Sequence, residues 1–173
     1  MNHSLPTVHI VLLNYRGGED TVACLESVLK LDYKNIKIIV CDNFSNDGSY
    51  EFIKDWFLNN YKSLYQDRFK KGDMNYDLND VSYNEITRQD IGTKALHKKT
   101  VAPVTFIKSD KNLGYAGGNN FGMLYAKSDP HFEFIWILNN DTIVKKDSLG
   151  YALDNNSTFS NPHNLLTEGV ISA

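Results

Sequence analysis

The chain contains little cysteine and no cluster of histidines. Its 173 residues include two cysteines, Cys24 and Cys41, and neither belongs to a CxxC pair or another spacing typical of metal ligands. The five histidines stand far apart, at positions 3, 9, 97, 131 and 163, which argues against a zinc motif. We therefore expect both cysteines to be small buried side chains in a reducing compartment.

Two common nucleotide-binding signatures are also missing. No Gly-x-x-x-x-Gly-Lys-Ser/Thr sequence occurs, which argues against a P-loop nucleotidase. The first apolar run leads into Asn-Tyr-Arg-Gly-Gly at residues 14–18 instead of Gly-x-Gly-x-x-Gly, which disfavours a dinucleotide-binding Rossmann domain. The two glycines of this turn either bring the backbone close to a ligand or simply serve the turn.

Strong net charge and long apolar runs are absent as well. A formal net charge of -3 gives no general attraction to nucleic acid or acidic lipid, so any phosphate ligand must be held by local groups. No run approaches the ~20 apolar residues that cross a bilayer. Residues 1–6 lack the basic and apolar regions of a signal peptide. These features predict a cytoplasmic protein without a transmembrane segment, with peripheral membrane contact as an option for a longer form.

What the sequence does contain is an alternation of strand and helix patterns. Short β-branched runs typical of buried parallel strands occupy residues 8–13, 36–41, 104–107 and 134–137. Apolar residues at helical spacing lie between them, over 19–31, around 52–57 with Asp47 or Ser49 as the N-cap, and around 121–125 after Gly117 and Gly118. This alternation predicts one α/β domain with a mostly parallel sheet and helices on both faces.

Polar residues follow each predicted strand, at Asn14, Asp42, Asp110 and Asp141. In a doubly wound sheet these positions lie along one edge, where such folds bind ligands. Asp141 ends the sequence Leu-Asn-Asn-Asp directly after a buried strand, where a carboxylate is well placed to hold a hard divalent cation. The alternative interpretation is an aspartate that caps the next helix.

Two polar loops add to this edge. In residues 41–49, Asp42 lies where a carboxylate can accept a hydrogen bond from the ring N–H of uracil or thymine, although an Asx-rich loop that caps the next helix is the simpler alternative. In residues 110–120, glycines allow close backbone approach and Lys111 supplies a cation ahead of a helix N-terminus. A purely structural turn remains the alternative for this second loop.

Taken in order, four motifs resemble those of the family 2 glycosyltransferases, especially the rhamnosyltransferase-like branch. They are Leu-Asn-Tyr, Asp-Asn-x-Ser-x-Asp-Gly-Ser, Asn-Leu-Gly-Tyr-Ala-Gly-Gly-Asn-Asn and Leu-Asn-Asn-Asp-Thr, spread over about residues 8–144. The resemblance implies a GT-A-type, Rossmann-like fold that binds a nucleoside-diphosphate sugar. The implied enzyme inverts configuration and transfers a sugar from a UDP- or dTDP-sugar, with rhamnose among the candidates, to a glycan or lipid-linked acceptor.

The resemblance also implies roles for single residues. Asp42 would read the base, and Asp141 would bind Mg²⁺ or Mn²⁺, with Asn139 in place of the first aspartate of the family's Asp-x-Asp motif. The implied nucleotide-sugar site consists of Asn14, Asp42, Lys111, Asn112, Gly117, Asn120, Asn139 and Asn140.

The chain departs from the family pattern in two respects. Family members usually run well past this length and carry their general base in the second half, so we expect residues 1–173 to be an incomplete donor-binding domain with the base beyond Ala173. Residues 167–173 read as the start of a fifth strand, whose unpaired edge would favour self-association. Residues 59–103 form a polar insertion, which we expect to be mostly disordered, with a short helix over 61–69 as the one regular element.

Two other functions compete with the transferase. A non-catalytic nucleotide-sugar-binding module would share the fold and the motifs. A flavodoxin-like receiver domain also gathers aspartates at strand ends, but it has no use for the glycine-asparagine loop of residues 112–120.

Overall fold

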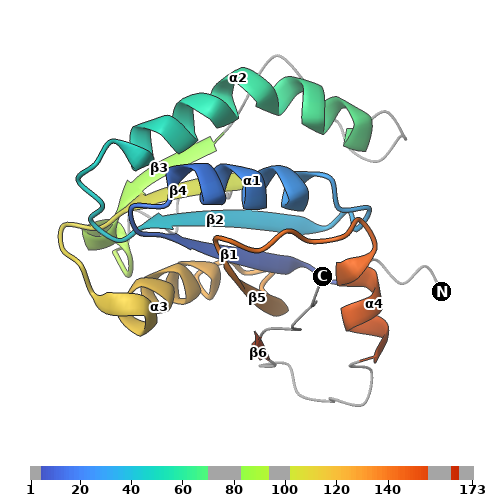
Figure 1. Ribbon diagram of the computed structural model, residues 1–173. Helices are drawn as coiled ribbons and strands as arrows, with labels where there is room; N and C mark the ends of the chain where they lie inside the picture. The colour runs from blue at the N-terminus through green and yellow to red at the C-terminus, as the bar shows by residue number, and fades with distance from the viewer. Residues whose placement is uncertain (1–4, 70–82, 94–101, 156–164, 168–173) are drawn as a thin grey trace.

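The centre of the fold is a sheet of six parallel strands (Figure 1). The computed structural model describes residues 5–69, 83–93, 102–155 and 165–167. The strands run in the order β3-β4-β2-β1-β5-β6. Their bounds are Val8–Asn14 for β1, Ile36–Asp42 for β2, Tyr83–Thr87 for β3, Val104–Lys108 for β4, Phe134–Asn139 for β5 and Leu165–Thr167 for β6. All four strands expected from the apolar runs are confirmed.

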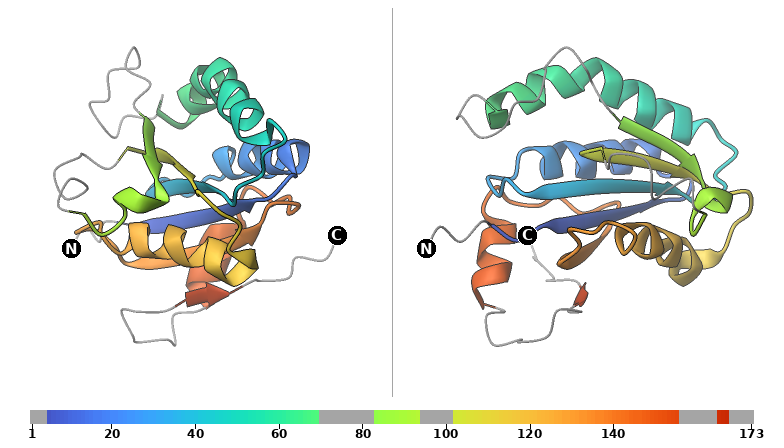
Figure 2. Two further views of the ribbon diagram at one scale, coloured as in Figure 1. Left: turned by 90° about the vertical axis from the view of Figure 1, so that its left-hand side faces the viewer. Right: turned by 180° about the vertical axis from the view of Figure 1, so that it is seen from behind.

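Helices cover both faces of this sheet. Helices α1 (Gly18–Leu29) and α2 (Ser49–Phe69) lie on one face, and α3 (Gly114–Ala126) lies on the other, as Figures 1 and 2 show. A fourth helix, α4 (Ser148–Asn155), follows β5, and a 3₁₀ turn, η1 (Arg88–Asp90), follows β3. The predicted α/β class is therefore confirmed. Within the part of the chain that the structure describes, no helix is both long and apolar enough to cross a membrane.

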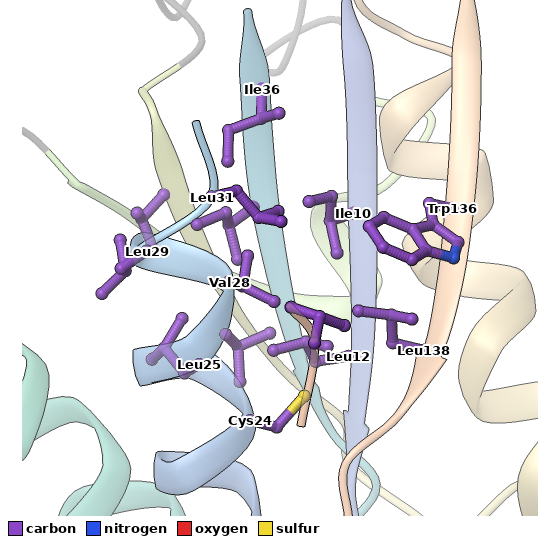
Figure 3. Packing of buried hydrophobic residues seen from close by; sticks show 14 of the residues in the cluster. Ile10, Leu12, Cys24, Leu25, Val28, Leu29, Leu31, Ile36, Trp136 and Leu138 are labelled. Carbon is purple, nitrogen blue, oxygen red and sulfur yellow. The ribbon is translucent and has the colours of Figure 1, made fainter. Parts of the chain in front are cut away.

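Strand β1 separates two apolar cores and is buried along its whole length. Its side chains alternate between the faces of the sheet: Ile10 and Leu12 join the core under α1 and α2, whereas Val11 and Leu13 join the core over α3. Figure 3 shows Ile10 and Leu12 against the side chains of α1, including Leu25. Each such side chain contributes about 1.5–3 kcal/mol through burial, so the central strands are firmly held.

Helix α3 lies unusually close to the sheet because of its glycines. A Cβ atom on Gly118 would stand 2.5 Å from Leu13 Cδ1, and one on Gly122 would stand 2.8 Å from Cys41 Sγ. The expectation that this helix begins after Gly117 and Gly118 is wrong, since it begins at Gly114. Close packing on the sheet outweighs the low helix propensity of glycine at these positions.

The segment 59–103 is more ordered than its composition suggested. Helix α2 continues to Phe69, and β3 pairs in parallel with β4. Ile86 of β3 is buried, while Glu85 accepts hydrogen bonds from Tyr50 Oη at 2.8 Å and Lys54 Nζ at 3.1 Å. The short helix expected over 61–69 is confirmed as the end of α2. The expectation of disorder is wrong for 83–93, because contacts with α2 and β4 stabilise residues whose own pattern is weak. The rest of that expectation, over 70–82 and 94–101, lies outside the described residues.

The final strand was expected over residues 167–173, whereas the structure has β6 at Leu165–Thr167, which pairs with β5 and shares only Thr167 with the expected range. It is the sixth strand instead of the fifth because the sequence pattern did not reveal β3. Residues 168–173 lie outside the described part of the chain.

Candidate functional site

The strand ends form a row at the carboxyl edge of the sheet, which faces the viewer in the left view of Figure 2. The register aligns Asn14 with Asp42, Asp42 with Lys108, and Leu13 with Asn139. The loops after β1, β2, β4 and β5 therefore start from one level. Residues far apart in the sequence meet there, as the strand-end pattern predicted.

A pocket of about 330 Å³ opens at this edge. Its lining is mainly amide and aromatic, with one acidic residue, and consists of Leu13, Tyr15, Asn43, Asn112, Gly114, Tyr115, Asn139, Asn140 and Asp141. Of the predicted site residues, Asn112, Asn139, Asn140 and Asp141 line this pocket. The structure thus brings the loop before α3 together with the end of β5.

Hydrogen bonds among the lining residues shape the pocket. Asn43 Oδ1 accepts the backbone N–H of Leu113 at 2.9 Å, and Asn43 Nδ2 donates to Asn112 Oδ1 at 3.0 Å. Across the pocket, Tyr115 Oη donates to Asn139 Oδ1 at 2.8 Å. Asn43 therefore fixes the loop that leads into α3, and Tyr115 joins the start of α3 to the end of β5.

The lining of this polar pocket includes an exposed aromatic ring, that of Tyr15. Tyr15 is 44% exposed, and the Arg16 guanidinium lies 5.3 Å from its ring centroid. Arg16 itself has a left-handed backbone with φ of 58°, held by Ser45, whose hydroxyl accepts the Arg16 N–H at 3.1 Å. An aromatic face beside polar side chains suits a planar ring that also needs hydrogen bonds.

Asp42 and Asn14, both predicted to bind the nucleotide, lie beneath the pocket and do not line it. Asp42 is 2% exposed and Asn14 is fully buried. Asp42 Oδ1 accepts hydrogen bonds from Asn14 Nδ2 at 2.8 Å and Ser45 Oγ at 2.5 Å, and Oδ2 accepts the Ser45 N–H at 3.2 Å. This burial gives both residues a supporting place under the loop of residues 43–48.

Asp141 is the acidic residue of the pocket and is exposed. In the described ranges, no group of three or more His, Cys, Asp or Glu side chains is arranged to hold a metal ion. The neighbouring Asn139 and Asn140 add amide oxygens but no charge. One carboxylate with amide neighbours suits a cation that takes its remaining ligands from water and from phosphate oxygens.

The nearest thiol is not a candidate nucleophile. Cys24 Sγ lies 3.6 Å from the carbonyl oxygen of Asn139, just below the pocket. Burial, together with the negative charge of Asp141, raises the pKa of the Cys24 thiol to about 12. The thiol is therefore neutral at ordinary pH and serves packing, as the sequence suggested.

The other predicted residues lie around the pocket without lining it. Lys111 is exposed on the loop between β4 and α3, while Gly117 and Asn120 belong to α3. Asp110 is turned towards η1, where Arg88 Nη2 lies 2.6 Å from its carboxylate and lowers its pKa through a hydrogen bond.

Five lining residues were not predicted, namely Leu13, Tyr15, Asn43, Gly114 and Tyr115. Tyr15 and Asn43 each follow a predicted strand-end residue directly, so the alternation of side chains around the strand end was the signal that could have found them. Gly114 and Tyr115 belong to the motif of residues 112–120, in which Asn112, Gly117 and Asn120 were the predicted site residues.

Comparison with known proteins agrees with this architecture. A putative glycosyltransferase EpsE of Bacillus subtilis (strain 168) is 25% identical over 125 residues, which cover 66% of this chain and 43% of that protein. Crystal structures of S. aureus TarS 1-349 share the fold: one superposes with a TM-score of 0.51 at 13% identity, covering 88% of this chain and 32% of that one. TarS 1-349 in complex with UDP-GlcNAc gives a TM-score of 0.52 at 13% identity, covering 88% of this chain and 31% of that one. The chain thus spans less than half of the curated relative and about a third of the TarS 1-349 structures.

The family assignment comes from the sequence itself. Residues 7–72 and 90–155 match the family model described as glycosyl transferase family 2. These two segments contain β1, β2, β4, β5 and every residue that lines the pocket. The chain therefore belongs to glycosyltransferase family 2.

Proposed function

We propose that this chain is the donor-binding part of an inverting glycosyltransferase that uses a UDP- or dTDP-sugar. The observation that carries the proposal is the pocket at the carboxyl edge, where amide and aromatic side chains surround one exposed carboxylate, Asp141. A nucleoside diphosphate offers a planar base for the aromatic face, and phosphate oxygens for a cation held at the carboxylate.

The nucleoside end of the donor is assigned to Tyr15 and the loop that follows β2. TarS 1-349, which shares the fold, has been crystallised with UDP and with UDP-GlcNAc, and this supports a uridine donor. Asp42 lies beneath this loop. In our proposal its carboxylate either accepts a hydrogen bond from the ring N–H of the base or holds Asn43 in position to contact the base. Rhamnose, which the dTDP form would carry, remains one of the candidate sugars.

The diphosphate end is assigned to Asn112, Asn139, Asn140 and Asp141. Lys111, Gly117 and Asn120 border this end and are proposed to approach the phosphates or the sugar. Mg²⁺ or Mn²⁺ held by Asp141 would neutralise the negative charge that builds up on the leaving diphosphate. Because Asp141 is the one carboxylate in the pocket lining among the described residues, we expect the cation to bind together with the nucleotide and only weakly without it.

The proposed reaction is a single displacement. An acceptor hydroxyl oxygen, from a glycan or a lipid-linked sugar, forms the new bond to the anomeric carbon while the bond from that carbon to the diphosphate oxygen breaks on the opposite face. The hydroxyl proton passes to a carboxylate base. We propose that this base lies beyond Ala173, because the match of this chain covers only 43% of the curated relative. A lipid-linked acceptor would bring the protein to a membrane surface.

The second candidate is a nucleotide-sugar-binding module without activity. The observation that favours it is the lack of a second acidic residue in the lining of this pocket, among the residues that the structure describes. Such a module would bind the donor equally well and transfer nothing.

Calorimetric titration of the chain with UDP and dTDP, with and without Mn²⁺, tests the donor site. We expect binding that strengthens with Mn²⁺, and no binding of either nucleotide would refute both candidates. Incubation of a form extended at its C-terminus with UDP- and dTDP-sugars then separates them. Release of the nucleoside diphosphate with a new glycosidic bond identifies the transferase, whereas tight binding without turnover identifies the module.

A further inference from the structure

The end of β1 is the centre of a buried hydrogen-bond network. Asn14 has no exposed surface and uses both sides of its carboxamide. Its Nδ2 donates to Asp42 Oδ1 at 2.8 Å and to Ser49 Oγ at 2.9 Å. Its Oδ1 accepts the Gly17 N–H at 3.2 Å and lies 3.1 Å from the Thr21 hydroxyl, whose single proton is shared with the Gly17 carbonyl oxygen at 2.7 Å. Asn14 thereby joins the ends of β1 and β2 to the first turns of α1 and α2.

Thr21 extends this network to the opposite wall of the pocket. It is fully buried, and its Oγ1 accepts a hydrogen bond from Asn140 Nδ2 at 3.0 Å. Gly17 leaves the necessary space, because a Cβ atom there would stand 2.7 Å from Asn140 Nδ2. Gly17, the N-cap of α1, thus leaves room for the Asn140 side chain, and Thr21 in the first turn of α1 binds it.

Three members of the network directly precede residues that line the pocket, and one of the three, Asn140, lines it as well. Asn14 precedes Tyr15, Asp42 precedes Asn43, and Asn140 precedes Asp141. Adjacent residues share a planar peptide bond, so anchoring the first residue of each pair restricts where the second can lie. A buried polar network whose members are all hydrogen-bonded is rigid, because any displacement leaves a polar group unsatisfied.

We propose that Asn14 and Thr21 are positioning residues, which hold the wall carrying Tyr15 and the wall carrying Asp141 at a fixed separation. The ligand class that needs both walls at once is a nucleoside diphosphate with its cation, and this inference rests on the proposed function of the pocket. Asn14 therefore supports the site from beneath and does not contact the donor.

The test compares variants at α1 that do not touch the pocket surface. Thr21→Val keeps the shape of the side chain but removes its hydrogen bonds, Thr21→Ser keeps the hydroxyl, and Gly17→Ala pushes against Asn140. A matched glycine control is Gly150→Ala in α4, where a Cβ atom would meet nothing within 4 Å. In titrations with UDP and Mn²⁺, we expect Thr21→Val and Gly17→Ala each to weaken binding by roughly fivefold to tenfold. Thr21→Ser should recover most of the loss, and Gly150→Ala should bind like the wild type.

A double-mutant cycle separates positioning from a general loss of stability. If Thr21 acts through Asp141, then Thr21→Val should cause no further loss of UDP–Mn²⁺ affinity in an Asp141→Asn background. Losses that simply add would overturn the proposal.

Amide NMR spectra of the ligand-free protein give a readout that does not depend on the proposed function. We expect Thr21→Val to shift the resonances of Tyr15 and Asp141, while Gly150→Ala leaves them in place. Unchanged resonances at both residues would overturn the positioning role. A wild type that binds no uridine or thymidine nucleotide would overturn the link to a donor, and the spectra would still decide whether Thr21 holds the two walls.

Discussion

Tyr115 and Asn139 join two elements of the pocket through one hydrogen bond of 2.8 Å, from the Tyr115 hydroxyl to the Asn139 side-chain oxygen. Tyr115 belongs to the first turn of α3, and Asn139 is the last residue of β5. By the resemblance drawn from the sequence, Asn139 would take the place of the first aspartate of the family's Asp-x-Asp motif. An amide at this position can accept the tyrosine hydroxyl without placing a second negative charge beside Asp141.

The first prediction follows from this bond. Tyr115→Phe should weaken the binding of UDP with Mn²⁺ by roughly twofold to tenfold, the range expected for one hydrogen bond, because the start of α3 loses its tie to β5. Tyr115 is 56% exposed, so the melting temperature should hardly change. Calorimetric titration measures the affinity, and Tyr151→Phe on α4 is a matched control outside the pocket. Equal affinity of Tyr115→Phe and wild type would show that this bond does not shape the donor site.

Asp141→Asn should abolish the Mn²⁺ dependence of UDP binding and leave the fold intact. The substitution keeps the shape of an exposed side chain and removes the one charge that the pocket offers to a cation. Titrations with and without Mn²⁺ should give the same weak affinity for the variant. Asp147→Asn, at another exposed aspartate, is the matched control. If Asp141→Asn retains the full Mn²⁺ effect, the cation site lies elsewhere.

Asp42→Ala should lower both the free energy of unfolding and the affinity for uridine, whether or not metal is present. Loss of the carboxylate leaves Asn14 Nδ2 and Ser45 Oγ without a strong acceptor in a buried place, which costs about 1–3 kcal/mol. Chemical denaturation and uridine titration measure the two effects. Ser45→Ala disturbs the same network but keeps the carboxylate. If it reduces uridine affinity as much as Asp42→Ala does, Asp42 acts through the loop instead of reading the base.

Acid should destabilise the fold in two stages, and His9 should cause the first. His9 is buried, with Nε2 at 2.9 Å from Asp129 Oδ2, and Lys37 also forms an ion pair with Asp129. Burial lowers the pKa of His9 below its ordinary 6.5, and the hydrogen bond with Asp129 offsets only part of this effect. Below about pH 6.5, His9 therefore binds a proton more readily in the unfolded chain than in the folded chain. The free energy of unfolding falls as the pH drops.

The second stage belongs to Asp129. Burial acts to raise the pKa of its carboxyl group, but hydrogen bonds from Lys37 and from the His131 N–H outweigh burial and bring it below the ordinary 3.8. Stability from this group is present above about pH 4 and is lost as the pH falls further. Urea denaturation between pH 7 and pH 5 isolates the first stage. His9→Gln should flatten the slope there, whereas the exposed-site control His131→Gln should retain it.

Gly118→Ala should destabilise the protein, although alanine is the better helix former. The added methyl group would stand 2.5 Å from Leu13 Cδ1, so α3 or the end of β1 must move. Such overpacking typically costs about 1–3 kcal/mol, against a gain of up to ~1 kcal/mol from helix propensity. Gly150→Ala has open space around it and should be neutral or slightly stabilising. Thermal unfolding of the two variants compares them directly, and equal melting temperatures would contradict the packing role of Gly118.

Much of the fold could be predicted from the sequence because the central strands carry their own signal. The residues of β1 and β2 are buried on both faces of the sheet, which requires near-continuous β-branched and aliphatic runs. Strand β3 gives no such signal, since Ile86 is its one buried residue and its pairing depends on β4. Likewise, the glycines of α3 resemble a ligand-binding loop in the sequence. In the structure, Gly118 packs against Leu13 of the sheet.

For the candidate site, the sequence predicted the edge of the sheet but not the depth of each side chain. Asp42 is the last residue of β2 and Asp141 follows the end of β5, yet Asp42 is 2% exposed and Asp141 lies open to solvent. The difference arises because Asp42 meets Asn14 from the neighbouring strand β1 and Ser45 from the loop that directly follows β2. The contact with Asn14 is set by the register of the two strands, which a single sequence does not state.

Strand β3 lies where the match of this chain to the family model is interrupted, between residues 72 and 90. It occupies the outer position of the sheet, beside β4 and farthest from β5. A strand at this margin of the sheet does not alter the order of β4, β2, β1 and β5. A change of length between α2 and β4 would therefore fall at the margin of the sheet, away from the ends of β1 and β5 that carry pocket residues.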